Sequence, residues 1–60
     1  MDLSETERAV LQRIGLEAVH IDDIIAQSGL SPAEAAHILL VLEMKDVICA
    51  IEGKRFLRAP

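Results

Sequence analysis

The sequence predicts a mainly α fold in which three helices are followed by a small C-terminal β-hairpin. Two capping boxes of the form Ser-x-x-Glu, at residues 4–7 and 31–34, each precede apolar residues at helical spacing. A β-branched run after Asp46 is interrupted by a turn triplet containing glycine. Sixty residues suffice for one domain, so we expect residues 1–60 to form a single one.

The first helix is predicted over residues 3–14. Ser4 and Glu7 form a capping box, in which each side chain accepts a hydrogen bond from the other residue's backbone N–H. Gly15 follows and is expected to end the helix in the left-handed conformation. Three apolar residues lie on the predicted buried stripe: Val10, Leu11 and Ile14.

A short strand and a short second helix are predicted next. Residues 19–21 are too few for a helix and indicate an edge strand. The helix over residues 22–28 begins with Asp22 and Asp23, where the helix dipole favours negative charge. Neighbouring helical residues do not face each other, so these carboxylates are expected to cap the helix and not to form an acid/base pair. His20 is a second candidate for the cap.

The third helix has the strongest local signal. Ser31 is a typical N-cap, Pro32 suits the first helical position, and Glu34 completes a capping box. We expect the helix to end near Lys45, with Asp46 in the turn position that Gly or Asn usually takes. Its predicted core stripe is Ala35, Ile38, Leu39 and Leu42.

A β-hairpin is predicted at the C-terminus, with strands over residues 47–51 and 55–58 and a turn at residues 52–54. Cys49 lies in the first strand and is expected to be a small buried residue. Three helices, the last two joined by a short connection, followed by a hairpin indicate a winged helix, a version of the helix-turn-helix.

Composition excludes several classes of function. With two His and one Cys, the usual four-ligand zinc site and an intramolecular disulfide are not expected. His20 and His37 lie far apart in the sequence, and the three glycines are isolated, so no phosphate-binding loop is indicated. No nucleophile with a base beside it is recognisable. We therefore expect no cofactor, no metal and no enzymatic activity.

A cytoplasmic location is expected. The longest uninterrupted apolar run covers only residues 38–42, which is too short to cross a bilayer. Met1 is followed by acidic and polar residues, so no signal peptide is expected either. A single thiol suits a reducing compartment.

The third helix lacks the side chains that a DNA-reading helix needs. Such a helix presents Arg, Lys, Asn or Gln to base edges, whereas residues 32–44 contain none of them and carry Glu34 and Glu43. The chain has a net charge of −4, which opposes binding to phosphates. The outward arc of this helix is predicted to hold Ala33, Ala36, His37, Leu40, Val41 and Met44.

Exposed apolar residues on that arc would mark a protein contact. Leu40 and Val41 are the stronger candidates, while Met44 is expected to be mostly buried under Ile48. The full candidate interface is Ala33, His37, Leu40, Val41 and Met44.

The hairpin supports an alternative function. Lys54, Arg55 and Arg58 form the basic cluster of the chain and are possible contacts for nucleic acid. In that case the chain would belong to a transcription regulator that binds duplex DNA through the hairpin. A cluster of this kind is more often a solvated strand end.

Five segments of the chain resemble a known family. They are LSETE at residues 3–7, VHIDDI at 19–24, SGLSPAE at 28–34, LLVLEM at 39–44 and GKRF at 53–56. Their order and spacing resemble the C-terminal winged-helix domain of the bacterial DNA-processing protein A family (DprA, also called Smf), from Leu3 to about Arg58. Asp46 departs from the family's usual Gly, and Ile25 and Val41 are apolar where polar residues are commoner.

The resemblance implies that the chain is the tail of a larger protein. In this family a Rossmann-like domain binds incoming single-stranded DNA and helps to load RecA during natural transformation. That domain is not in the sequence, so none of its DNA-contacting residues can be transferred. The winged helix is the accessory part in this family, and the apolar, acidic third helix suits a non-catalytic protein-contact module with weak or no DNA binding of its own. Its expected partners are other domains of the parent protein, a second copy or proteins of the RecA pathway, and not a membrane.

Overall fold

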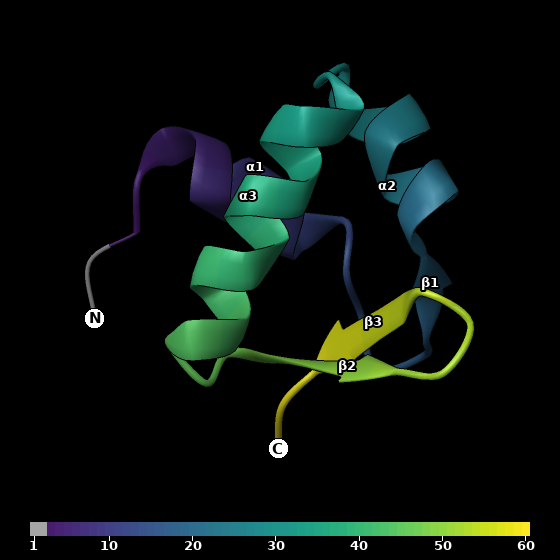
Figure 1. Ribbon diagram of the computed structural model, residues 1–60. Coiled ribbons are helices and arrows are strands. Elements are labelled where there is room, and N and C mark those ends of the chain that lie inside the picture. Colours follow the sequence, from purple (N-terminus) through teal and green to yellow (C-terminus); the bar gives the residue numbers. More distant parts are fainter. Residues whose placement is uncertain (1–2) are drawn as a thin grey trace.

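Three helices cover one face of a three-stranded antiparallel sheet (Figure 1). The computed structural model describes residues 3–60. In chain order the elements are α1 (Glu5–Gln12), β1 (Val19–His20), α2 (Ile21–Ser28), α3 (Pro32–Met44), β2 (Ile48–Ile51) and β3 (Arg55–Arg58). The predicted helices, hairpin and short additional strand are confirmed, and they form a winged helix.

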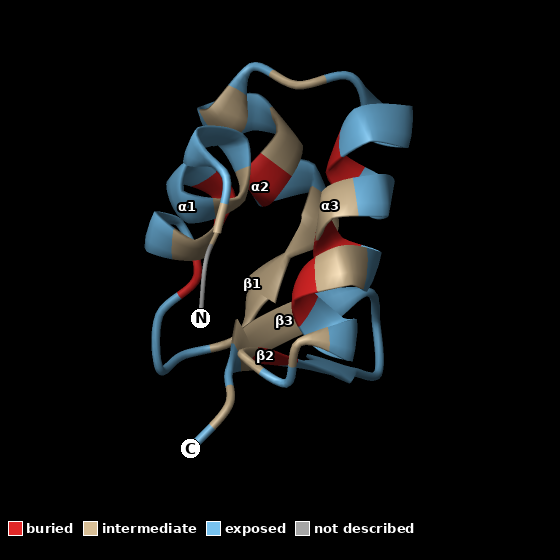
Figure 2. Cartoon of the chain, turned by 90° about the vertical axis from the view of Figure 1, so that its left-hand side faces the viewer, coloured by how far each residue is buried: buried red, intermediate tan, exposed pale blue. Residues whose placement is uncertain are grey.

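The core lies between the helices and the sheet, and the buried segments in Figure 2 face this interior. All three helices and β2 contribute to it, with the intervening residue Ile14. The buried cluster consists of Val10, Ile14, Ile24, Leu39, Leu42 and Ile48. Ala35 is buried as predicted, whereas Ile38 is half-buried and packs against the edge of the cluster.

The capping box of α1 is formed as predicted. The Ser4 hydroxyl accepts a hydrogen bond from the Glu7 N–H at 3.1 Å, and a Glu7 carboxylate oxygen accepts one from the Ser4 N–H at 3.0 Å. These two bonds satisfy N–H groups that have no partner inside the helix.

The predicted end of α1 is wrong. The helix ends at Gln12, and Gly15 is not left-handed, because Gly29 and Gly53 are the glycines with positive φ among residues 3–60. The N–H groups of Arg13 and Ile14 donate to carbonyls three residues back, which tightens the last turn. The Gly15 carbonyl then accepts a 3.0 Å hydrogen bond from the Arg58 N–H of β3. Because the chain pairs with β3 at Gly15, the helix ends at Gln12, before the predicted residue 14.

The cap of α2 is His20, so the prediction that Asp22 and Asp23 cap this helix is wrong. His20 Nδ1 accepts a hydrogen bond from the Asp22 N–H at 3.0 Å. His20 is also the last residue of β1 and has the extended backbone that an N-cap requires (φ −72°, ψ 147°). The two carboxylates lie in the first turn. At the other end Gly29 adopts the left-handed conformation (φ 73°).

The helices α2 and α3 form the helix-turn-helix pair. The chain bends by 112° between them, which lies within the range of about 90–120° typical of this motif. Ser31 and Glu34 make the predicted capping box of α3. Beyond the C-cap Lys45, Asp46 takes the left-handed position with φ 61°. Among residues 3–60, no single helix is long and apolar enough to cross a membrane; α2 and α3 reach that length and hydropathy only as a bent pair.

In the sheet, β3 lies between β1 and β2. Ile48 pairs with Arg58 and Cys49 with Leu57 along the hairpin, while Val19 of β1 pairs with Phe56. The prediction that Cys49 is buried is wrong, because successive side chains of a strand point to opposite faces. Ile48 fills the core, so its neighbour Cys49 is exposed on the far face.

Candidate functional site: the outer face of α3 and the wing

The predicted interface residues of α3 share one outward face. Ala33, His37, Leu40 and Met44 follow one another at spacings of four, three and four, so they form a single stripe, called here the α3 stripe. All four are exposed, with Leu40 at 54 % and Met44 at 75 % of their full surface. Val41 lies at the margin of the stripe and is half-buried.

The prediction that Met44 is mostly buried is wrong. Met44 lies two positions beyond the buried Leu42, which places it about 200° further around the helix. Ile48, the residue expected to cover it, points into the core instead. Met44 therefore adds to the apolar surface of the stripe.

The charged residues next to the α3 stripe are acidic or already paired. Glu34 and Glu43 are exposed, on either side of the stripe. Lys45, just after the helix, donates a 3.0 Å hydrogen bond to the Glu7 carboxylate of α1. The exposed face of this helix therefore offers aliphatic side chains and carboxylates, and it lacks the cations and amides that bind phosphates and base edges.

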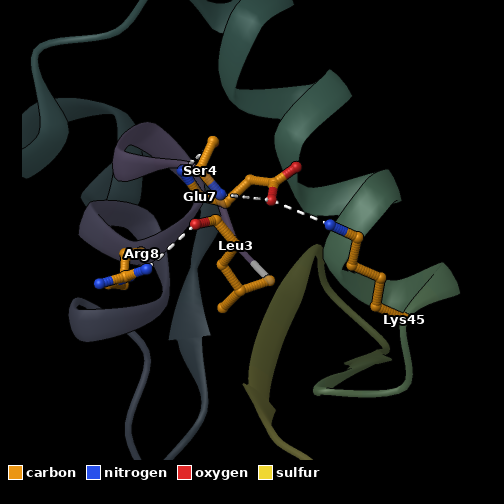
Figure 3. A network of polar contacts seen from close by, with 5 residues as sticks. All are labelled: Leu3, Ser4, Glu7, Arg8 and Lys45. Atoms are coloured by element: carbon orange, nitrogen blue, oxygen red, sulfur yellow. Dashed lines mark hydrogen bonds and ion pairs between the residues drawn. The ribbon is translucent and has the colours of Figure 1, made fainter. Parts of the chain in front are cut away.

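The Glu7 carboxylate joins the start of α1 to the end of α3 (Figure 3). The same oxygen accepts from the Ser4 N–H and from the Lys45 ammonium group, both at 3.0 Å. The hydrogen bond from the Ser4 backbone and then the bond from Lys45 lower the pKa of Glu7 below its ordinary value of 4.5. The network also includes Arg8, whose guanidinium donates to the Leu3 carbonyl at 3.2 Å.

The wing separates the three basic residues of the predicted nucleic-acid cluster. Lys54 and Arg55 are exposed at the turn, where Arg55 Nε donates to the Glu52 carbonyl at 2.9 Å. Arg58 lies at the other end of β3, and its guanidinium donates to the carbonyls of Ile14 at 2.7 Å and Leu11 at 3.0 Å. Only the pair at the turn remains together as a candidate contact.

Sequence reasoning missed this function of Arg58. Its two acceptors are 44 and 47 residues away in the sequence, and backbone carbonyls carry no residue-specific signal. It also missed the exposed edge of β2, because the position of a strand in the sheet depends on the strand order.

Neither histidine belongs to a cluster of metal ligands in the described part of the chain. His20 accepts a backbone hydrogen bond at the start of α2, and His37 is exposed on the α3 stripe. Residues 3–60 contain no group of three His, Cys, Asp or Glu side chains that could hold a metal ion, and no pocket.

Comparison with protein families gives a match that covers most of the chain. The model of the DprA winged helix domain matches residues 1–54 of the 60. No curated protein and no solved structure matches the chain. The three helices, the 112° bend and the terminal wing are the architecture that this family name describes. The chain therefore belongs to the DprA winged helix domain family.

Proposed function

We propose that this domain is an accessory protein-contact module of a DprA-like protein and that it binds its partner through the α3 stripe. The observation that carries the proposal is the exposure of Leu40 and Met44 on the helix that would face DNA in a duplex reader. Winged helix domains are typically non-catalytic, in keeping with a module that acts by contact. In this proposal the parent protein binds incoming single-stranded DNA and helps to load RecA during natural transformation.

Burial of the exposed side chains supplies the driving force. Full burial of a Leu or Met side chain contributes about 1.5–3 kcal/mol, and both residues retain more than half of their surface for a partner to cover. The partner is another part of the parent protein, a second copy of the chain or a protein of the RecA pathway. The net charge of −4 and the carboxylates beside the α3 stripe favour such a partner over a polyanion.

Charge substitution on the stripe tests this function. Leu40→Glu and Met44→Glu each place a carboxylate on the proposed contact without touching the core. We expect each to weaken binding of the domain to the rest of the parent protein, or to RecA, by at least about tenfold in calorimetric titrations. Ala9→Glu adds the same charge to an exposed site on α1 and serves as the matched control. Equal affinities for the control and both stripe variants would exclude the α3 stripe.

Duplex binding through the wing is the second candidate, supported by the exposure of Lys54 and Arg55 at the turn. Fluorescence anisotropy with a labelled duplex at low salt separates the two functions, since phosphate contacts are strongest there. We expect no binding at high micromolar domain concentration. Binding that Lys54→Ala or Arg55→Ala abolishes would favour the DNA contact instead.

A further inference from the structure

The strand β2 presents an open backbone edge. It pairs with β3 on one side, and the strand order places no described strand on the other. The Arg58 N–H donates toward Gly15 and the next N–H, that of Ala59, donates to Val47 of the β2 side. Because directions alternate along an antiparallel ladder, the N–H and C=O groups of Ile48 and Ala50 point away from β3. No described residue bonds to these groups, so they are available to pair with another strand.

This edge lacks the features that usually prevent pairing between proteins. Exposed edge strands are commonly protected by a charged side chain, a proline or a bulge. The sequence of β2 is Ile-Cys-Ala-Ile, with no charge and no proline, and it pairs with β3 without a bulge. Three of its four residues are exposed.

The open edge and the α3 stripe belong to neighbouring elements. In Figure 1 β2 runs below the C-terminal end of α3, and in Figure 2 it extends from the centre of the view toward the lower right, below the same helix end. α3 stands over the sheet with its C-terminal end next to β2, and the two elements are in contact. Together the β2 edge and the α3 stripe form what we call the β2–α3 face. Neither part contains Asp, Glu, Lys or Arg.

We propose that the β2–α3 face binds a second copy of this chain, by antiparallel pairing of β2 with its own copy about a two-fold axis. The proposal rests on the function proposed above and names the occupant of that surface. The outward donors and acceptors of one β2 edge match those of an identical antiparallel edge, so the edge is self-complementary. Identical charged faces repel, whereas the residues of this face are uncharged and the exposed Glu34 and Glu43 lie at its margins, although the chain carries a net charge of −4.

The required contact area explains why both parts of the face take part. A standard stable interface buries about 800 Å² per partner, which is about a fifth of the 4063 Å² surface of the described chain. The edge of a four-residue strand is too small to provide this area. The two-fold axis places both α3 helices on the same side of the joined sheet, and the proposed dimer requires that the exposed Leu40 and Met44 of each copy contact the other copy.

Only one register uses Ile48 and Ala50 of both copies and no turn residue. Ile48 then lies opposite Ala50 of the second copy, and the axis passes between the two Cys49 residues. Cys49 faces its own copy in a pair without backbone hydrogen bonds, where Cα atoms are about 4.5 Å apart. A disulfide accepts Cα separations of roughly 4.4–6.8 Å. The single cysteine of the chain is therefore a probe of the register.

Oxidative cross-linking and sedimentation test the pairing. We expect sedimentation equilibrium of the reduced chain at high micromolar concentration to give twice the chain mass. Mild oxidation with diamide, which takes up the two thiol hydrogens, should convert most of the protein to a Cys49-linked dimer. Cys49→Ser should remain a non-covalent dimer.

Ala50→Pro is the decisive variant. It removes an outward N–H that has no part in the ladder with β3, and proline is tolerated at such edge positions. The expected result is a monomer whose cross-linking yield falls at least tenfold, with helical circular dichroism retained. Ala50→Ser keeps the N–H and should behave as the parent chain.

Two results would overturn the pairing. One is a monomeric parent chain at high micromolar concentration, and the other is a dimer that is insensitive to Ala50→Pro or not captured through Cys49. Failure of the pairing is distinguishable from failure of the proposed function. If Leu40→Glu abolishes binding to the parent protein while Ala50→Pro changes nothing, the α3 stripe binds another partner and only the self-association is wrong.

Discussion

The guanidinium group of Arg58, in the central strand of the sheet, forms hydrogen bonds with the C-terminal end of α1. Its hydrogen bonds give the Leu11 carbonyl, which also accepts from the Ile14 N–H, a second donor, and they supply a donor to the Ile14 carbonyl just beyond the helix. The planar guanidinium donates to both acceptors at once, through Nε and Nη2. A basic residue that resembles a phosphate contact in the sequence thus acts as part of the fold.

We predict that Arg58→Met lowers the free energy of unfolding by about 1.5–3 kcal/mol, the usual contribution of hydrogen bonds to a charged group. Arg55→Met makes the same change in the same strand, where only an exposed bond within the turn is lost. It should cost less than about 0.5 kcal/mol, as typical surface substitutions do. Urea unfolding monitored by circular dichroism measures both. Equal losses for the two variants would contradict the structural role of Arg58.

At the scale of the element, the end of α3 sets the direction of the hairpin. Asp46 has a φ of 61°, a conformation that is unfavourable for residues with a Cβ atom. The N–H of the next residue, Val47, donates to the Leu42 carbonyl at 3.2 Å, which closes the end of the helix. The turn therefore requires the left-handed conformation at this position whichever residue occupies it.

Asp46→Gly is expected to raise the free energy of unfolding by up to about 1 kcal/mol, because glycine adopts positive φ without steric cost. Asp46→Val should lower it by about 1–2 kcal/mol, since β-branched residues are the least compatible with this conformation. Thermal unfolding of the three proteins gives the order. A destabilised glycine variant would show that the Asp46 side chain contributes more than its backbone costs.

The elements themselves were largely predictable because their signals are local. Both capping boxes, the left-handed Gly29 and the turn containing Gly53 depend on residues within a few positions of one another. The end of α1 was not predictable, because Gly15 pairs with Arg58, which is distant in the sequence. The cap of α2 was only partly predictable, because His20 is an unusual N-cap and both following aspartates compete for that role in the sequence.

At the scale of the whole molecule, the contact between Glu7 and Lys45 links the first helix to the last across 38 positions of the chain. Bonds from the Ser4 backbone and from Lys45 hold the pKa of Glu7 below 4.5 in the folded state. Between this lowered value and the ordinary one, the unfolded chain binds more protons than the folded one. The stabilisation is complete above about pH 4.5 and is lost as the pH falls through the lowered pKa of Glu7.

Glu7→Gln tests this pH dependence. Glutamine at the same position can still complete the capping box, so the variant mainly removes the charge. We expect the variant to be less stable than the parent chain at neutral pH, with a difference that shrinks progressively below about pH 4.5. Urea unfolding at a series of pH values down to about 3 measures it, with Glu5→Gln as the control from the same turn. A difference that does not vary with pH would exclude the charge of Glu7 as its cause.

The amino-acid sequence by itself determined the number and order of the helices, the hairpin and the family, because capping, spacing and turn signals act over a few residues. It also predicted that α3 carries apolar and acidic side chains and no cation, because these residue types are read directly from the sequence. The tertiary structure alone decided that Met44 is exposed, that Arg58 binds the end of α1 and that the β2 edge is open. These properties depend on contacts between residues that are far apart in the sequence, and patterns of neighbouring residues do not reveal such contacts.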